Sequence, residues 1–382
     1  MGHIVQKLDD DWPAVKALLR TSKMMKLYIM IARVQHLNNK TLMAKINGPT
    51  NVAEGESPLT MAIWNNEFLR RLELDDPGFK KDDFAGIEMI NIPEGLVHLR
   101  ARTFVGCNNL KFILQTSLET IGDRAFVHCS RLPKIKFPKS LKTIGRFAFS
   151  SCHDLKKIEL CHTIITSIPD GAFANCSKLT TIEFPASLKM IGERAFEYCS
   201  KLTTIEFPES LESIGERAFQ NCSNLKNIDM TQTTITSILP LTFDKCSNLT
   251  TIVFPESLVS IGTWAFGKCS NLTTIVFPES LESIGNGAFA YCEGLTTIVF
   301  PESLKSIGTW AFENCSNLTK IDLHHTQIRS IERDAFLDSN LQEVVLPTNQ
   351  VHIHNRAFEH IHNRAFDPHV HFLLQQHIKT MY

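Results

Sequence analysis

The sequence predicts a repeat solenoid, with a parallel β-sheet on one face of stacked coils and turns and short extended or 3-10 segments on the other. Three observations predict it. Phenylalanine recurs at steps of 22 to 24 residues, ten of eleven cysteines stand three residues after such a phenylalanine, and a β-type pattern ends in proline at the same point of many coils. A period of this length is typical of stacked units that have no core of their own. The repeated phenylalanines are Phe104, Phe126, Phe149, Phe173, Phe196, Phe219, Phe243, Phe266, Phe289, Phe312, Phe336 and Phe358.

Residues 1–70 do not repeat, and we expect a helical N-terminal region that caps the first strand. Ser57-Pro58 predicts the start of a short helix that continues through Trp64. From Trp12 to Ala53 the chain carries seven lysines and arginines and no acidic residue. A basic amphipathic helix can bind an anionic membrane surface, so residues 12–46 are a candidate membrane contact. The alternative is the solvated face of a helical cap.

Residues 71–347 are expected to form the solenoid, and one coil shows how each unit folds. Ile252 and Phe254 alternate with Val253, so the first two point inward and Val253 points outward. Pro255 ends the strand because proline cannot donate a hydrogen bond to a ladder.

The second half of the coil returns the chain to the core. Leu258 and Ile261 are expected to point inward, and Gly262 is expected to adopt a backbone angle that other residues avoid. Three coils carry one extra residue and no proline after the strand, which predicts a different turn. These segments are Leu160–Ile165, Met230–Ile235 and Leu323–Ile328.

The in-register cysteines predict a buried column of free thiols. No two are spaced C-x-x-C, and parallel side chains in one column have poor disulfide geometry. Free thiols in this number fit a reducing compartment, and the first residues lack the pattern of a signal peptide. We therefore expect a cytoplasmic protein, with the cell surface as the alternative. The glycosylation pattern Asn248-Leu-Thr also suits an ordinary turn.

Residues 348–382 are expected to form a His-rich C-terminal cap. The segment His352–Phe358 is repeated as His360–Phe366, and His-x-His on a strand can hold a transition metal. No nearby cysteine or carboxylate set completes a site of recognised spacing. The favoured interpretation is therefore a degenerate capping repeat, and no metal site is expected.

Function is expected on the outer face of the sheet. Outward positions are acidic in the middle of the chain and valine further on, which suits a basic region and an apolar anchor of one partner. The alternative is ordinary surface charge with good strand formers. The candidate partner-binding residues are Glu159, Glu183, Glu206, Asp229, Val253, Val276 and Val299.

The consensus L-x-x-I-x-F-P-x-S-L-x-x-I-G-x-x-A-F-x-x-C resembles the BspA-like leucine-rich repeat. It stands almost unchanged at residues 179–199, 202–222, 249–269, 272–292 and 295–315. The resemblance implies a leucine-rich repeat solenoid. It also implies a non-catalytic motif, in a family whose members are mostly surface or interaction proteins of microbes. The absence of a signal pattern departs from its secreted members.

Composition and the absence of known motifs exclude several classes of function. Formal net charge is −1, which gives no general attraction to nucleic acid. Dinucleotide, phosphate-loop, hydrolase and zinc-protease motifs are absent, so no catalytic residue and no cofactor is expected. We expect a monomeric, non-enzymatic scaffold that binds a protein partner on the sheet face. Alternatives are an adhesion protein exported without a recognisable signal, or a peripheral membrane protein held by the N-terminal helices.

Overall fold

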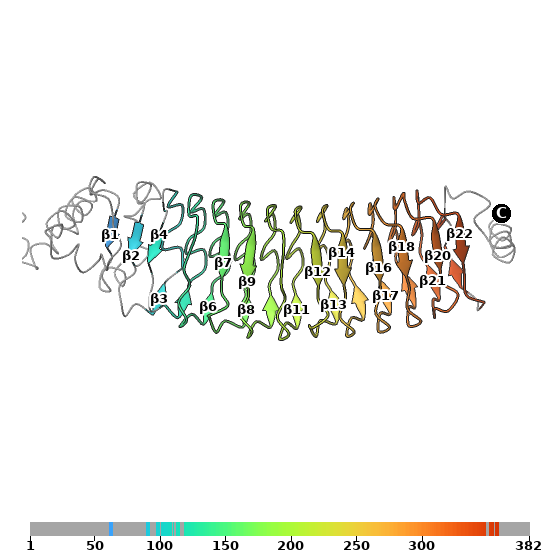
Figure 1. Cartoon of the computed structure of the whole chain (residues 1–382), viewed down its shortest axis with the longest axis horizontal. Helices are drawn as coiled ribbons and strands as arrows, with labels where there is room; N and C mark the ends of the chain where they lie inside the picture. The colour runs from blue at the N-terminus through green and yellow to red at the C-terminus, as the bar shows by residue number, and fades with distance from the viewer. Residues whose placement is uncertain are drawn as a thin grey trace, which may run out of the picture.

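The computed structural model describes residues 61–63, 89–91, 97–99, 101–108, 110, 112–114, 118–348, 351–354 and 356–358. Across these residues the chain winds into an elongated solenoid, with successive coils in sequence order along its long axis (Figure 1). Two rows of strands run along the rod, one at each side of the coils. Within the described ranges, no helix has the length and apolar character needed to cross a membrane.

The first ladder consists of three-residue strands. They pair in parallel, and Thr274, Ile275 and Val276 lie opposite Thr297, Ile298 and Val299. The ladder is divided into sheets of two or three strands. Its strands are β1 (Met61–Ile63), β2 (Met89–Asn91), β4 (Phe112–Leu114), β7 (Lys157–Glu159), β9 (Thr181–Glu183), β12 (Asn227–Asp229), β14 (Thr251–Val253), β16 (Thr274–Val276), β18 (Thr297–Val299), β20 (Lys320–Asp322) and β22 (Glu343–Val345).

The second ladder consists of two-residue strands, so the short extended segments expected on this side also pair with one another. β13, β15, β17, β19, β21 and β23 form one six-stranded parallel sheet. The strands are β3 (His98–Leu99), β5 (Thr120–Ile121), β6 (Thr143–Ile144), β8 (Ser167–Ile168), β10 (Met190–Ile191), β11 (Ser213–Ile214), β13 (Ser237–Ile238), β15 (Ser260–Ile261), β17 (Ser283–Ile284), β19 (Ser306–Ile307), β21 (Ser330–Ile331) and β23 (His352–Ile353).

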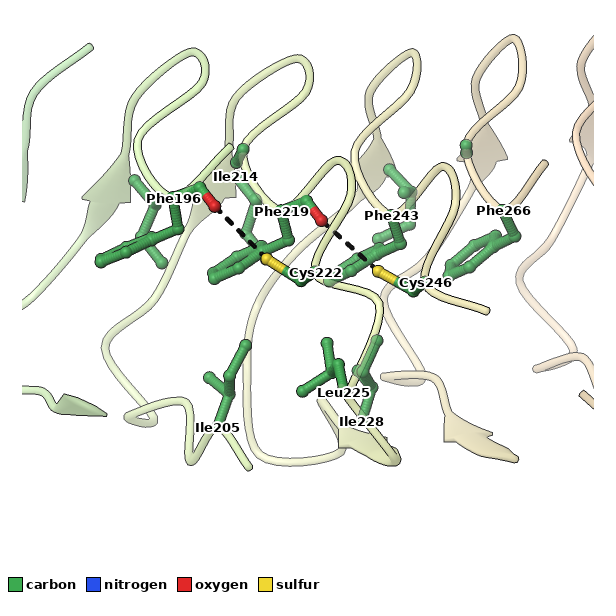
Figure 2. Packing of buried hydrophobic residues seen from close by; sticks show 14 of the residues in the cluster. Phe196, Ile205, Ile214, Phe219, Cys222, Leu225, Ile228, Phe243, Cys246 and Phe266 are labelled. Carbon is green, nitrogen blue, oxygen red and sulfur yellow. Dashed lines mark hydrogen bonds between the residues drawn. The ribbon is translucent and has the colours of Figure 1, made fainter. Parts of the chain in front are cut away.

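The repeated phenylalanines form one interior column, which confirms the periodicity argument. From Phe104 to Phe358 every consecutive pair of rings is stacked, with centroids 5.1–5.5 Å apart. Phe196, Phe219, Phe243 and Phe266 show this stack in close view (Figure 2). Phenylalanines at strand ends pack edge-on against it, as Phe300 does against Phe312. Each coil therefore completes its core only against its neighbours.

The cysteine column is also confirmed. The ten in-register thiols are buried and free. From Cys129 to Cys315 each thiol donates a hydrogen bond of 3.2–3.4 Å to a phenylalanine carbonyl of the preceding coil. Figure 2 shows two of these bonds, from Cys222 and Cys246. Burial raises the pKa of the thiols from Cys129 to Cys315, to about 12 for Cys176 and Cys292.

The predicted role of Gly262 is wrong. Its φ is not positive, whereas Trp264 and Lys268 in the same coil have φ values of 54° and 59°. Gly262 instead permits a close approach between coils. A Cβ at this position would lie 2.8 Å from the backbone nitrogen of Pro240 and 2.9 Å from the carbonyl oxygen of Ile238. Real Cβ atoms do not come this near, so the glycine is required by the neighbouring coil.

The coils with one extra residue contain the different turn that the sequence predicts. In each turn a buried threonine donates its hydroxyl to the carbonyl three residues earlier, at 2.7–2.8 Å. The residue after the strand donates its backbone N–H to the next coil, as Met230 does to the carbonyl oxygen of Val253 at 3.0 Å. The threonines are Thr163, Thr233 and Thr326.

The short helix expected through Trp64 is contradicted, because Met61–Ile63 forms strand β1. This strand pairs in parallel with β2, in which Met89 lies opposite Met61. The other features predicted for residues 1–70, including the candidate membrane contact at residues 12–46, lie outside the described residues. So does most of the His-rich segment 348–382.

Candidate binding face

Six of the candidate partner-binding residues occupy the outer face of the first ladder, and Glu206 lies two residues after Thr204, which forms an isolated bridge to Thr181 of β9. Their neighbours in the strands, such as Ile252 and Ile275, are buried, and alternation turns the candidates toward solvent. The strand register places Glu159 opposite Glu183, and Val276 opposite Val299. The structure thus aligns along one face residues that the sequence separates by a full coil.

Three of these residues form what we call the valine patch: Val253, Val276 and Val299. Their side chains are 47%, 57% and 48% exposed, although each belongs to a strand with a buried centre. Behind the patch the rings of Phe254, Phe277 and Phe300 stack at 5.8–5.9 Å between centroids. A patch supported in this way loses little conformational freedom on binding.

A lysine partly neutralises the acidic part of the face. Lys157 Nζ lies 2.8 Å from Glu159 Oε1 and 2.7 Å from Glu183 Oε1, so the repulsion expected between stacked carboxylates is relieved. The hydrogen bond from Lys157, followed by that from the Cys161 thiol, lowers the pKa of Glu183. Cys161 lies outside the buried column and is exposed.

The negative charge available to a partner is therefore concentrated nearer the valine patch. Within residues 118–348, no ion pair of Glu206 is found. Asp229 Oδ1 accepts hydrogen bonds from the backbone N–H and hydroxyl of Thr231, at 2.9 and 2.8 Å, and these bonds lower its pKa. Asp229 lies directly opposite Val253 in the register, so the acidic and apolar surfaces are continuous.

Sequence reasoning missed a cluster farther along the same face. Asp322 occupies the outward position of β20, and its Oδ1 lies 2.7 Å from His324 Nδ1. Burial raises the pKa of Asp322, but the hydrogen bonds from His324 outweigh it, and the pKa lies below its usual value. The available signal was an aspartate followed at two and three residues by histidine, in a turn already recognised as different.

Comparison with known proteins identifies the repeat. A family model described as a BspA type leucine rich repeat region (6 copies) matches residues 79–166, 166–277 and 236–365. No curated protein matches the chain.

Several solved structures are similar to the chain. A leucine-rich repeat protein from Bacteroides ovatus is 25% identical with a TM-score of 0.39, covering 65% of this chain and 85% of that one. A leucine rich cell surface protein from Faecalibacterium prausnitzii is 24% identical with a TM-score of 0.46, covering 78% and 86%. The pneumococcal vaccine antigen PcpA is 23% identical with a TM-score of 0.41, covering 76% of each chain. Because the family model matches more than half of its length, the chain belongs to the BspA-type leucine-rich repeat family.

Proposed function

We propose that this leucine-rich repeat protein is a monomeric, non-enzymatic scaffold that binds a protein partner through the outer face of its first ladder. The observation that carries the proposal is the valine patch. Its three valine side chains are about half exposed and lie on β14, β16 and β18, which are consecutive strands of the first ladder. The stacked rings of Phe254, Phe277 and Phe300 lie beneath them. Contiguous apolar surface on a rigid support is typical of interaction sites.

The surroundings of the patch define the chemistry of the partner. Outward threonines on the same strands, Thr251, Thr274 and Thr297, offer hydroxyls beside the apolar surface. Glu206 and Asp229 add negative charge on the N-terminal side. An apolar core with a polar rim is the usual anatomy of a protein interface. We therefore expect the partner to present apolar side chains that are followed, toward Glu206, by lysine or arginine.

The absence of enzyme activity is part of the proposal. The in-register cysteines from Cys129 to Cys315 supply many thiols, but burial raises their pKa, and a protonated buried thiol is a poor nucleophile. Each is also committed to a hydrogen bond with the preceding coil. These cysteines serve packing rather than chemistry.

We also propose a cytoplasmic location, which rests on thiol chemistry. Cys161 is exposed and free, and such a thiol persists best in a reducing compartment. Asn248 offers a check, because it is exposed within an Asn-Leu-Thr pattern. A glycan on Asn248, or recovery of the chain from the cell surface, would contradict this location.

The test of the binding face is the substitution Val276→Asp. Aspartate is tolerated at this position of a coil, since Asp229 and Asp322 occupy it elsewhere. The matched control is Val259→Asp, because Val259 is 41% exposed beside β15 of the second ladder. In quantitative affinity capture with the full chain, we expect the Val276→Asp variant to fail to capture the protein that the parent chain captures. Val259→Asp should retain it. Retention by Val276→Asp would remove the valine patch as the site.

A further inference from the structure

The third of the extra-residue turns brings two histidines and an aspartate together. Thr326 closes the turn by donating its backbone N–H and hydroxyl to the carbonyl of Leu323, at 3.0 and 2.7 Å. The closed turn places the rings of His324 and His325 edge to face, with centroids 4.8 Å apart. One ligand atom from each of Asp322, His324 and His325 lies within 4.8 Å of the others.

A hydrogen bond to the neighbouring coil fixes the tautomer of His325. Its Nε2 lies 2.9 Å from the carbonyl oxygen of Phe300. A carbonyl oxygen only accepts, so Nε2 carries the hydrogen and the lone pair of the neutral ring is on Nδ1. That Nδ1 lies 3.5 Å from His324 Nδ1. Metal-binding histidines characteristically donate their other ring N–H to a carbonyl or carboxylate in this way.

Aspartate completes the arrangement on the other side of His324. Asp322 Oδ1 lies 2.7 Å from His324 Nδ1 and also accepts the backbone N–H of His324 at 3.1 Å. Since a carboxylate accepts, the proton between these two side chains belongs to His324 Nδ1 in the metal-free protein. The spacing of the three side chains is thus already set by the backbone of the turn.

Two of the three separations between the ligand atoms are close to those around one small cation. Ligand atoms about 2.0–2.1 Å from a tetrahedral Zn²⁺ lie roughly 3.3 Å from one another. The two separations along the cluster, 2.7 and 3.5 Å, bracket that value. Two imidazole nitrogens with one carboxylate oxygen suit zinc, copper or nickel, whereas calcium and magnesium prefer oxygen ligands alone.

We propose that Asp322, His324 and His325 form a binding site for a divalent transition metal ion such as Zn²⁺. The ligands are Asp322 Oδ1, His324 Nδ1 and His325 Nδ1. The carbonyl oxygen of Phe300 holds the His325 ring in place by accepting the hydrogen bond from Nε2–H of that ring. On binding, the proton of His324 Nδ1 leaves through solvent, Nε2 of the same ring takes up a proton, and the metal occupies the vacated position. Three protein ligands leave a fourth position for water.

An equivalent turn shows that the histidines are not needed for the fold. Residues 229–233 read Asp-Met-Thr-Gln-Thr, and Thr233 closes this turn as Thr326 closes the other. Thr231 donates to Asp229 as His324 does to Asp322. The chain therefore contains its own metal-free template, with threonine and glutamine in place of the histidine pair.

The experiment uses that template. The double variant His324→Thr, His325→Gln copies the equivalent turn, and the single variant His325→Gln guards against misfolding of the double one. Metal-free full chain is titrated with ZnCl₂ in a calorimeter, with MgCl₂ as the second probe. The C-terminal histidines are present in every variant, so any Zn²⁺ that they bind adds the same amount to each titration. Circular dichroism confirms the fold of each variant.

We expect the double variant to bind one equivalent of Zn²⁺ fewer than the parent, with no difference for MgCl₂. The single variant His325→Gln should bind this equivalent at least 10-fold more weakly, as should Asp322→Asn. Equal stoichiometry and affinity in the parent and in either folded histidine variant would overturn the proposal. So would a difference of the same size for MgCl₂.

Discussion

Ile275 and Val276 are neighbours in strand β16, yet they belong to regions that follow different rules. Ile275 is fully buried, and its inward position is isoleucine in nearly every coil. Val276 is 57% exposed, and its outward position changes along the rod. Those outward residues are Lys136, Glu159, Glu183, Glu206, Asp229, Val253, Val276, Val299, Asp322 and Val345.

This contrast separates the residues that specify the fold from the residues that can specify a partner. An interior residue contacts its equivalents in the coils before and after, as Phe219 stacks on Phe196 and Phe243. A change there disturbs both neighbours, so the interior is uniform. An outward residue makes few such contacts and can vary at little cost in stability. The interior therefore specifies the fold, while the variable outer face is where recognition is expected.

The largest effect should come from ionising the interior. Nine buried thiols, from Cys129 to Cys315, have a raised pKa in the folded chain because burial disfavours the thiolate. In the unfolded chain they ionise near pH 9, so the unfolded state binds fewer protons and stability falls as pH rises. Each thiol lowers the free energy of unfolding by up to about 1.4 kcal/mol per pH unit.

Together the nine thiols should remove on the order of 10 kcal/mol between pH 9 and pH 10. The measurement is urea unfolding of reduced protein at pH 7.5, 9 and 10. The unfolding midpoint should fall steeply only above pH 9. If the free energy of unfolding falls by no more than one thiol would cause, the cysteines of the column ionise in the folded chain as well.

A smaller but local effect is expected for Phe219→Ala. Phe219 is fully buried and stacks on both neighbouring rings, so the substitution leaves a cavity and should cost about 3–5 kcal/mol. Phe207→Ala is the matched control, because Phe207 is only partly buried and packs edge-on against Phe219. Urea unfolding measures both costs. Equal losses would place the two rings in equivalent environments and contradict the interior column.

The smallest effect is expected on the outer face. Val276→Asp should change the free energy of unfolding by less than about 0.5 kcal/mol, because the side chain is already in water. The adjacent Ile275→Ala should cost about 2–5 kcal/mol by comparison. A loss above 1 kcal/mol for Val276→Asp would mean that the valine patch stabilises the rod itself, which weakens its interpretation as a binding surface.

The interior was predictable from sequence because burial in a solenoid repeats with the coil. The phenylalanine and cysteine columns, and the inward direction of Ile252, follow directly from that period. The outward direction of the candidate residues follows from alternation along the strand. The extra-residue turns were recognised as turns because they lengthen the period by one residue.

Features that depend on two coils at once were not predictable. Gly262 is required by the backbone at Ile238 and Pro240, which only the stacked structure brings near. The clamp of Lys157 on Glu159 and Glu183 depends on side-chain conformations across a strand pair. Met61–Ile63 reads as helical because a lone strand of three residues carries too little pattern, yet it pairs with β2.

The identical contacts between coils have a consequence for how such a rod changes over generations. Residues 249–271, 272–294 and 295–317 are nearly the same in sequence and each is one full coil, so the removal of one preserves the period of the rest. Loss of 272–294 would join Asn271 to Leu295 and seat Phe266 against Phe312 with the same geometry. Val253 would then stand beside Val299. The apolar surface can therefore grow or shrink by whole coils, because each added or removed coil leaves the same interior contacts in place.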